Sequence, residues 1–406
     1  MRVLVLTQYY WPEAFRINEV VESLQGAGCS VTVLTGQPNY PDGKVYPGYR
    51  AWGWGREVHA TGYPIYRVPI VPRGRANAWR LALNYLSFVA SASTLGSRLL
   101  RRQRFDIIFV YGISPILQAI AAIALKRRTH AALVTWVQDQ WPQSLQSSGF
   151  VSNPRLLGWV GAVVRWIYRR SDLLLVQSQA FVAAVTAMAG GTPVAYHPNP
   201  GEAAFAEGGA NGPPKLVLPP GFNVVFAGNL GTVQALDTVL DAAELLLPYE
   251  DVHLVLIGAG SRRDWLEREV ARRGLSNVRL AGRFGPQDMP AILAQASALL
   301  VSLLRSPIMS QTIPSKVQAY LAAGRPVIAA LDGEGARVVT EAGAGVACGA
   351  EDAPALAQAV LSLRAATPET LQRLGAAGRS YYQQYFEPSM LAQKLVQQFR
   401  AAARPR

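Results

Sequence analysis

One turn near the middle of the chain has the residue types that bind an anionic group. The segment FAGNLG at 226–231 joins a strand-like run to a helix that we expect to begin near Gln234. Its candidate binding residues are Gly228, Asn229 and Gly231. Glycines in such a turn let backbone N–H groups approach a diphosphate, and the positive end of the helix dipole favours its charge. The turn therefore predicts a phosphate site, although many turns with two glycines bind nothing.

A second candidate is the segment TIPSKVQAYLAAGRPVIA at 312–329. Pro314 and Ser315 open a predicted helix, and Ser315 is a residue type that caps helix N-termini. Lys316 follows in the first turn, where a positive charge opposes the helix dipole unless an anion compensates it. This conflict favours a ligand phosphate beside Lys316. The alternative is that the lysine extends into solvent.

Three polar residues of the first half could contact a second substrate. Asp139 follows the strand-like run ALVTWVQ, and parallel α/β proteins bind ligands at the carboxyl ends of strands. We expect Asp139 to orient or deprotonate an acceptor hydroxyl, or else to cap a helix. Glu13 and Arg16 follow the first strand-like run and are expected at the same cleft, with helix capping as the alternative for Glu13.

Metal and disulfide chemistry have little support in the sequence. Cys29 and Cys348 lie far apart, which predicts neither a disulfide framework nor a cysteine metal site and suits a reducing compartment. The four histidines lie apart from one another and from acidic clusters: His59, His130, His197 and His253. We therefore expect a site that works without a metal or another cofactor.

Alternating apolar runs and helical segments must position these residues. A chain of 406 residues exceeds what one core usually organises, which predicts two domains. Strand-like runs separated by helical stretches are typical of βαβ units, so the predicted fold class is α/β with two Rossmann-like parallel-sheet domains facing a cleft. The expected strands are 3–7, 31–36, 65–71, 106–112, 132–139, 173–178, 223–229, 252–260, 278–284, 298–304, 326–331 and 345–348.

The domain boundary is expected in the segment 195–221, which is rich in proline and glycine. It separates a predicted N-terminal domain, 1–199, from a predicted C-terminal domain, 200–387. The last helical stretch, about 388–406, could cap the second domain or cross back to the first.

The net charge of +13 lies almost wholly in the first half, where residues 1–200 hold 20 Lys and Arg against 8 Asp and Glu. Such a field attracts anionic partners. The stretches 81–97 and 155–170 combine apolar side chains with arginines in or beside them, as basic amphipathic helices at a membrane interface do. The first is too polar and short for a transmembrane helix. The alternative is two buried helices with solvated ends.

Together these motifs resemble a known family. GNLG, GRF near Arg283 and PSKVQAYLAAGRPV are similar to motifs of the retaining glycosyltransferases of family 4, which have the GT-B fold. The segments 7–43 and 136–145 resemble the bacterial branch that adds amino-deoxy sugars, such as L-fucosamine, to lipid-linked intermediates of O-antigen and capsule. The resemblance extends over nearly the whole chain.

The resemblance implies a UDP-linked sugar donor bound mainly by the second domain and a polyprenyl-diphosphate-linked saccharide acceptor on the first. It implies that Lys316 and Arg283 neutralise the diphosphate, so that they act in catalysis together with Asp139. The implied donor-binding residues are Gly228, Asn229, Gly231, Gln234, Phe284, Gly285, Pro314 and Ser315. It also implies a peripheral enzyme on the inner face of the plasma membrane, without a metal.

One departure from the family pattern concerns two glutamates. Many members carry a Glu pair before the glycine-proline turn, and the matching positions here are Gln311 and Ala319. The sugar-hydroxyl contacts of that pair must therefore come from other residues.

Two other classes of protein remain as alternatives. A nucleotide-sugar epimerase of the same architecture needs no basic amphipathic surface and is expected to show more acid-base residues. A non-catalytic sugar-binding or nucleic-acid-binding protein would suit the charge, but no nucleic-acid module is recognisable and no nucleic-acid partner is expected.

Overall fold

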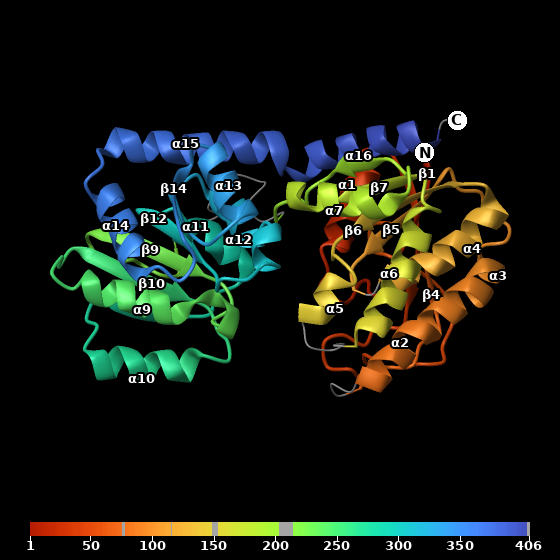
Figure 1. Ribbon diagram of the computed structural model, residues 1–406, viewed down its shortest axis with the longest axis horizontal. Helices are drawn as coiled ribbons and strands as arrows, with labels where there is room; N and C mark the ends of the chain where they lie inside the picture. Colours follow the sequence, from red (N-terminus) through yellow and green to blue (C-terminus); the bar gives the residue numbers. More distant parts are fainter. Residues whose placement is uncertain (75–77, 115, 148–152, 203–213, 404–406) are drawn as a thin grey trace. The chain divides into compact units, whose positions relative to one another are not determined.

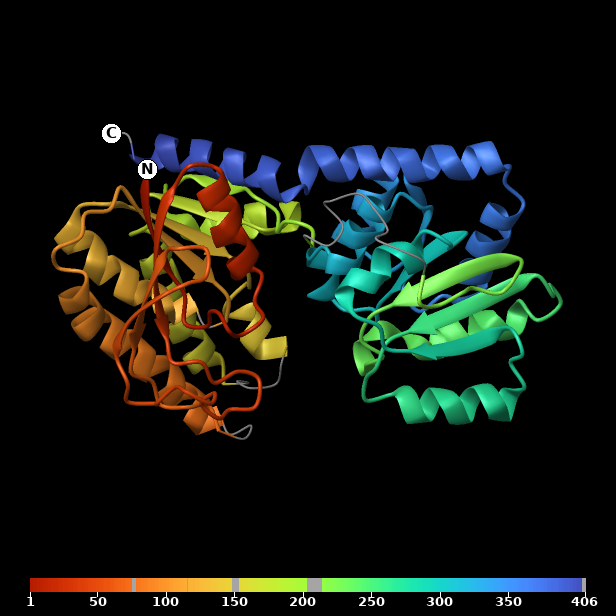
Figure 2. The same cartoon turned by 180° about the vertical axis from the view of Figure 1, so that it is seen from behind.

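The computed structural model describes residues 1–74, 78–114, 116–147, 153–202 and 214–403. It contains two compact α/β units (Figures 1 and 2). The first unit comprises Met1–Asn199 together with Ser389–Arg406, and the second comprises Pro200–Pro388. Each unit is built on one sheet that carries a hydrophobic core on either face.

The first sheet has eight strands in the order β3-β4-β2-β1-β5-β6-β7-β8. All neighbours are parallel except β3 and β4. The strands are β1 (Arg2–Leu6), β2 (Ser30–Gly36), β3 (Gly55–Val58), β4 (Pro64–Val68), β5 (Ile107–Gly112), β6 (Ala132–Val137), β7 (Leu173–Val176) and β8 (Val194–Tyr196).

Alternate side chains of β1 serve the two cores of this unit. Leu4 and Leu6 pack toward α2, α4, α6 and α7, whereas Val3 and Val5 pack toward α1 and α16. This alternation is the period of two that a buried strand imposes. The helices are α1 (Ile17–Gly26), α2 (Ala78–Ser91), α3 (Ser97–Leu99), α4 (Ala119–Thr129), α5 (Gln143–Ser147), α6 (Pro154–Tyr168), α7 (Gln179–Ala189) and α16 (Pro388–Ala403).

The last helix, α16, completes the first unit. Its apolar side chains, Leu395, Val396 and Phe399, belong to the same core as strands β1 and β5. The ring of Phe399 lies 5.1 Å from that of Phe109, centroid to centroid. The chain thus returns to its first unit after it has built the second.

The second sheet has six parallel strands in the order β11-β10-β9-β12-β13-β14. They are β9 (Phe222–Ala227), β10 (Val252–Ile257), β11 (Val278–Gly282), β12 (Ala298–Ser302), β13 (Val327–Ala330) and β14 (Gly345–Cys348). The helices are α9 (Leu236–Leu245), α10 (Arg263–Arg273), α11 (Met289–Leu293), α12 (Ser315–Ala323), α13 (Glu334–Glu341), α14 (Ala353–Arg364) and α15 (Pro368–Tyr385).

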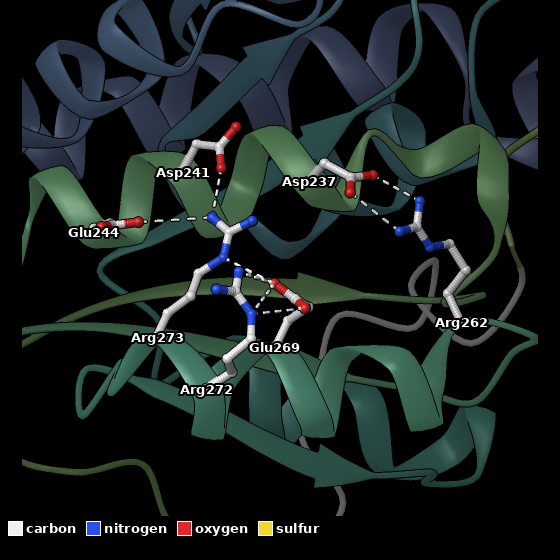
Figure 3. Close-up of polar contacts among 7 residues, drawn as sticks. All are labelled: Asp237, Asp241, Glu244, Arg262, Glu269, Arg272 and Arg273. Atoms are coloured by element: carbon white, nitrogen blue, oxygen red, sulfur yellow. Dashed lines mark hydrogen bonds and ion pairs between the residues drawn. The ribbon is translucent and has the colours of Figure 1, made fainter.

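Ion pairs join helix α10 to α9, and Leu266 is the one fully buried residue of α10 among those described. Arg273 lies between the two helices and pairs with Asp241 at 2.6 Å and with Glu269 at 3.0 Å (Figure 3). Arg262 forms a second bridge to Asp237 at 2.6 Å.

Two strands are absent from the sequence-based expectation. β3 runs antiparallel to β4 at the sheet edge, and alternate residues of β3 are exposed, so its sequence GREV lacks the apolar run of a buried strand. β8 is three residues long and only partly buried. The first sheet is therefore parallel, as expected, with one antiparallel edge strand that the sequence did not indicate.

Two helices of the first unit present large apolar side chains to solvent. On α2 these are Trp79, Leu83 and Leu86, and on α6 they are Leu156, Trp159 and Trp166. Trp79 is 72% exposed and Trp159 is 69% exposed, so neither helix buries its apolar residues fully. Within the described residues, no helix combines the length and hydropathy needed to cross a bilayer.

Candidate active site

A cavity of about 670 Å³ lies at the carboxyl edge of the second sheet. Residues at the ends of β9, β10 and β11 form one wall, and the start of α12 forms another. The structure brings these sequence-predicted residues to its surface: Gly228, Asn229, Gln234, Arg283, Phe284, Ser315 and Lys316. Gly285 and Pro314 are next to lining residues in the chain, and Gly231 lies two residues from Asn229, but none of the three lines the cavity.

Lys316 is the central charged group of this cavity. Its ammonium group donates a hydrogen bond to the side-chain oxygen of Gln234 and lies 3.7 Å from the centroid of the Phe226 ring. Burial lowers the pKa of Lys316 to about 7, because a low-dielectric environment disfavours the charged form. The lysine therefore does not extend into solvent, and a bound anion would favour its protonated form.

Gln234 is fixed so that it can hold the lysine. It is nearly buried, and its backbone carbonyl accepts a hydrogen bond of 2.7 Å from the hydroxyl of Ser302 on β12. The expected helix start near Gln234 is wrong by two residues, since Thr232–Gln234 forms a 3₁₀ turn and α9 begins at Leu236.

Position 228 requires glycine for two reasons, its backbone conformation and the lack of room for a side chain. Gly228 has φ +143°, and a Cβ atom there would lie 2.5 Å from Cε of Lys316. Its amide donates to the carbonyl of Ile257 at 2.9 Å, so the N–H of Gly228 itself already has an acceptor within the protein. The residue leaves room for the lysine.

Position 231 also has no room for a side chain. A Cβ atom at this position would lie 2.6 Å from the side-chain nitrogen of Asn229, so the glycine allows the asparagine to fold over the turn. Asn229 itself is exposed and lines the cavity. The expected direct contact of Gly231 with a ligand is not supported by its position outside the cavity wall.

The start of α12 differs from the expectation at one residue. Pro314 is the N-cap, so Ser315 is the first helical residue and makes no capping hydrogen bond. Because the N-cap falls one residue earlier, the prediction that Ser315 caps the helix is wrong. Ser315 and Lys316 nevertheless line the cavity at a helix N-terminus, where backbone N–H groups lack intrahelical acceptors.

The loop after β11 supplies the outer rim. Arg283 is exposed. Phe284 is half-buried and packs against one of the two hydrophobic cores of the second unit. The amide of Gly285 donates to the carboxylate of Asp288 at 3.2 Å, so Gly285 shapes the turn behind Phe284. An arginine and an aromatic ring at one rim can contact an anion and a planar ring system, respectively.

Sequence reasoning missed several residues of this cavity. The Tyr320 hydroxyl lies 2.8 Å from the amide of Ala227, which fixes the end of β9, and its spacing of four from Lys316 on one helix was an available signal. Gly258 ends β10 with φ +144°, and a Cβ there would lie 1.8 Å from the Gly228 carbonyl oxygen. Glu202 lines the cavity without a recognisable sequence motif.

Of the two positions that depart from the family pattern, only one lines the cavity. Ala319 lies in the cavity wall and offers only a methyl group there. Gln311 ends a 3₁₀ turn, Met309–Gln311, that precedes α12 and does not line the cavity. The cations Lys316 and Arg283 therefore supply most of the charge of this site.

Glu13 of the first unit has a structural position. Its side chain is buried, and its two oxygens accept hydrogen bonds from the amides of Tyr10, Asn39 and Tyr40 at 2.7–3.0 Å. Burial raises the pKa of Glu13, and the three backbone donors oppose that rise. The expectation that Glu13 faces a substrate is wrong, because its oxygens join two loops.

Arg16 and Asp139 lie near the same tyrosine. Burial of Tyr111 raises its pKa, the charge of Arg16 lowers it and the charge of Asp139 raises it further, so both charges act on this ring. Arg16 also pairs with Glu19 at 3.1 Å in the first turn of α1. Asp139 is half-buried and follows β6 by two residues, at the carboxyl edge of the first sheet.

Metal ligands do not cluster in the described part of the chain. Within residues 1–74, 78–114, 116–147, 153–202 and 214–403, no three His, Cys, Asp or Glu side chains lie close enough together to hold an ion. The charged side chains that line the cavity are those of Glu202, Arg283 and Lys316.

Each of the two units matches a family of known proteins. Residues 14–200 match the family model of the glycosyl transferase 4-like domain, and residues 221–365 match that of the glycosyl transferases group 1. WcaI of Escherichia coli (strain K12), which is named as a glycosyl transferase of colanic acid biosynthesis, is 27% identical over 342 residues. That match covers 80% of this chain and 82% of WcaI.

Solved structures share the fold at low identity. Sucrose-phosphate synthase from Thermosynechococcus elongatus superposes with a TM-score of 0.69 at 18% identity, covering 98% of each chain. HepE of Anabaena, solved in complex with UDP, has a TM-score of 0.68 at 14% identity, covering 99% of this chain and 100% of HepE. The predicted α/β fold class with two parallel-sheet domains is confirmed as GT-B.

Proposed function

Because this chain is a nucleotide-sugar-dependent glycosyltransferase of group 1 with the GT-B fold, we propose that it extends a lipid-linked saccharide with an amino-deoxy hexose. The donor in this proposal is a UDP-sugar, and the product belongs to the synthesis of a cell-surface polysaccharide. Similarity to WcaI and the resemblance of the segments 7–43 and 136–145 support this choice of pathway class.

The desolvated Lys316 beside Gln234 is the observation that supports donor binding in the cavity. A lysine with a lowered pKa in a polar cavity is typical of a functional site. A diphosphate placed there would meet the ammonium group, the N-terminus of α12 and the Arg283 guanidinium at the rim. HepE was solved with UDP, which supports a uridine nucleotide.

The same cations would stabilise the reaction. Negative charge develops on the diphosphate as the bond to the sugar breaks, and positioned positive groups lower the free energy of that transition state. We propose that Lys316 and Arg283 supply this stabilisation without a metal, and that the sugar is transferred with retention of configuration. Asp139 would orient the acceptor hydroxyl from the carboxyl edge of the first sheet.

We further propose that the enzyme works on the inner face of the plasma membrane. The exposed tryptophans of α2 and α6, with arginines on both helices, form the kind of surface that lies in a headgroup layer. Anionic lipid would attract the excess positive charge of residues 1–200.

A nucleotide-release assay tests the proposed transfer. A panel of UDP-, GDP- and dTDP-sugars is incubated with and without a polyprenyl-diphosphate-linked sugar. We expect acceptor-dependent release of UDP, which would establish transfer and identify the donor. Interconversion of the sugar without nucleotide release would instead assign an epimerase, and release of another nucleotide would contradict the UDP assignment.

A further inference from the structure

A second cavity, of about 800 Å³, lies in the first unit at the edge of the sheet where the strands begin. Its walls are the last residues of α4, the turn that follows α6 and the turn between α7 and β8. Asp139 follows the other end of β6, so this cavity is separate from the proposed acceptor site. The GNLG, GRF and PSKVQAYLAAGRPV segments do not contribute to it.

The cavity is strongly basic. Lys126 and Arg127 come from α4, and Arg169 and Arg170 follow α6. Its one carboxylate, Asp172, is paired with Lys126 at 2.7 Å. Within the described residues Arg127 and Arg169 form no ion pair. Cations at helix C-termini complement the helix dipole, but the dipole does not explain why two helices direct theirs to one cavity.

Two of these arginines are held in place. Gly190 has φ +59°, and a Cβ atom there would lie 2.5 Å from Nε of Arg169, so the glycine lets the arginine lie across the turn. The guanidinium of Arg170 lies over the ring of Trp166, 4.3 Å from its centroid. Their positions are therefore set by packing as well as by charge.

Trp166 connects the cavity to the exposed apolar surface of α6. It is one of three exposed large side chains on that helix, with Leu156 and Trp159. A phosphate group matches the cationic cavity, and an acyl or glycerol region matches the aromatic surface beside it. A soluble phosphate ester would use only the first of these two features.

We propose that this cavity binds the phosphate headgroup of an anionic phospholipid. The proposal rests on the membrane contact proposed above and adds to it a defined headgroup site. Arg127 and Arg169 contact the phosphate, while Trp166 and Trp159 lie in the interface. Binding here would fix the rotation of the first unit on the membrane, because the site lies at one end of α6.

Vesicle sedimentation of the full chain tests the headgroup site. The probes are phosphatidylcholine vesicles with and without phosphatidylglycerol, and inorganic phosphate alone. The pocket variant is Arg127→Ala with Arg169→Ala. The matched control is Arg128→Ala with Arg155→Ala, which removes the same charge from exposed positions on the same two helices outside the cavity. Thermal unfolding followed by circular dichroism reports whether each variant is folded, and UDP binding reports whether the donor site of the second unit is intact.

Each arginine lost near an anionic membrane weakens vesicle binding about fivefold through the loss of charge alone. The control variant measures this non-specific electrostatic effect. We expect the pocket variant to lose about tenfold more affinity for phosphatidylglycerol vesicles than the control, with UDP binding unchanged. Equal losses in the two variants would overturn the proposal. Loss of phosphate binding without loss of vesicle binding would assign a soluble anion and also overturn it. Failure of the wild type to bind UDP would instead contradict the proposed donor site.

Discussion

Lys316 and Gln234 are joined by a hydrogen bond between the ammonium group and the side-chain carbonyl oxygen, 82 positions apart in sequence. The acceptor is neutral, so the buried cation has no carboxylate to stabilise it in this contact. Burial of the ammonium group lowers the pKa of Lys316 to about 7, because a low-dielectric environment disfavours the charged form. The pair forms a site in which the missing negative charge would come from a ligand.

Replacement of Lys316 should remove transition-state stabilisation. We expect Lys316→Ala to lower kcat about 100-fold or more, as loss of one positioned charge-stabilising group does in other enzymes, with an unchanged melting temperature. Steady-state kinetics with the donor found in the nucleotide-release assay would measure this. Lys215→Ala is the control, because Lys215 is largely exposed and does not line the cavity. Equal kinetics in the two variants would remove Lys316 from the mechanism.

The lowered pKa of Lys316 predicts proton uptake on UDP binding. At pH 8 a lysine with a pKa of about 7 is mostly neutral, and a bound diphosphate raises the pKa by favouring the charged form. We expect uptake of close to one proton at pH 8 and of almost none at pH 6, where the lysine already holds its proton. Calorimetry in two buffers of different ionisation enthalpy measures the number. If Lys316→Met takes up the same number of protons as the wild type, Lys316 is not the group that is protonated.

Gly228→Ala should separate backbone strain from a steric effect on the lysine. A Cβ at position 228 would lie 2.5 Å from Cε of Lys316, whereas at Gly274, which also has positive φ, nothing lies within 4 Å. We expect both substitutions to cost about 1–2 kcal/mol of stability. Only Gly228→Ala should also weaken UDP binding, by about tenfold, when measured by calorimetry. Similar UDP affinity in both variants would show that the lysine can move aside.

The second sheet shows how far the sequence predicts the fold. Its strands read as short apolar runs because both faces are buried, and β9 and β10 lie within two or three residues of their expected bounds. β3 could not be found in this way, since an exposed edge strand has no apolar run. β11 and β14 are only partly buried, and their apolar runs still allowed them to be predicted.

The site was predicted less completely, for a different reason. Residue types and helix starts identify Lys316, but the direction of the Gly228 amide depends on the neighbouring β10 loop, to which it donates its hydrogen bond. Glu13 likewise has the residue type of a catalytic group, and only its three backbone donors show that it holds loops together. The roles of Gly228 and Glu13 both depend on hydrogen bonds to other segments of the chain, which the sequence pattern does not show.

Glu13→Gln should therefore destabilise the first unit. Hydrogen bonds to a charged acceptor contribute about 1.5–3 kcal/mol each, and the new amide group would face backbone donors with its own N–H. We expect a loss of about 2–4 kcal/mol in urea unfolding. Glu19→Gln, which removes a partly exposed carboxylate on α1, should cost less than about 1 kcal/mol. A stable Glu13→Gln with reduced kcat would restore a catalytic role for Glu13.

Arg273→Ala should loosen α10 from α9. Arg273 bridges Asp241, Glu244 and Glu269, and Leu266 alone among the described residues of α10 is fully buried, so ion pairs are a large part of what holds this helix (Figure 3). We expect a loss of about 1 kcal/mol in protection of the α10 amides, measured by native-state hydrogen exchange, since networked pairs exceed isolated ones. The effect should shrink in 1 M salt, where the Debye length falls to about 3 Å. Arg268→Ala is the control, because Arg268 is an exposed arginine of the same helix and takes no part in the ion pairs that Arg273 makes. Equal exchange in the two variants would mean that apolar packing holds α10.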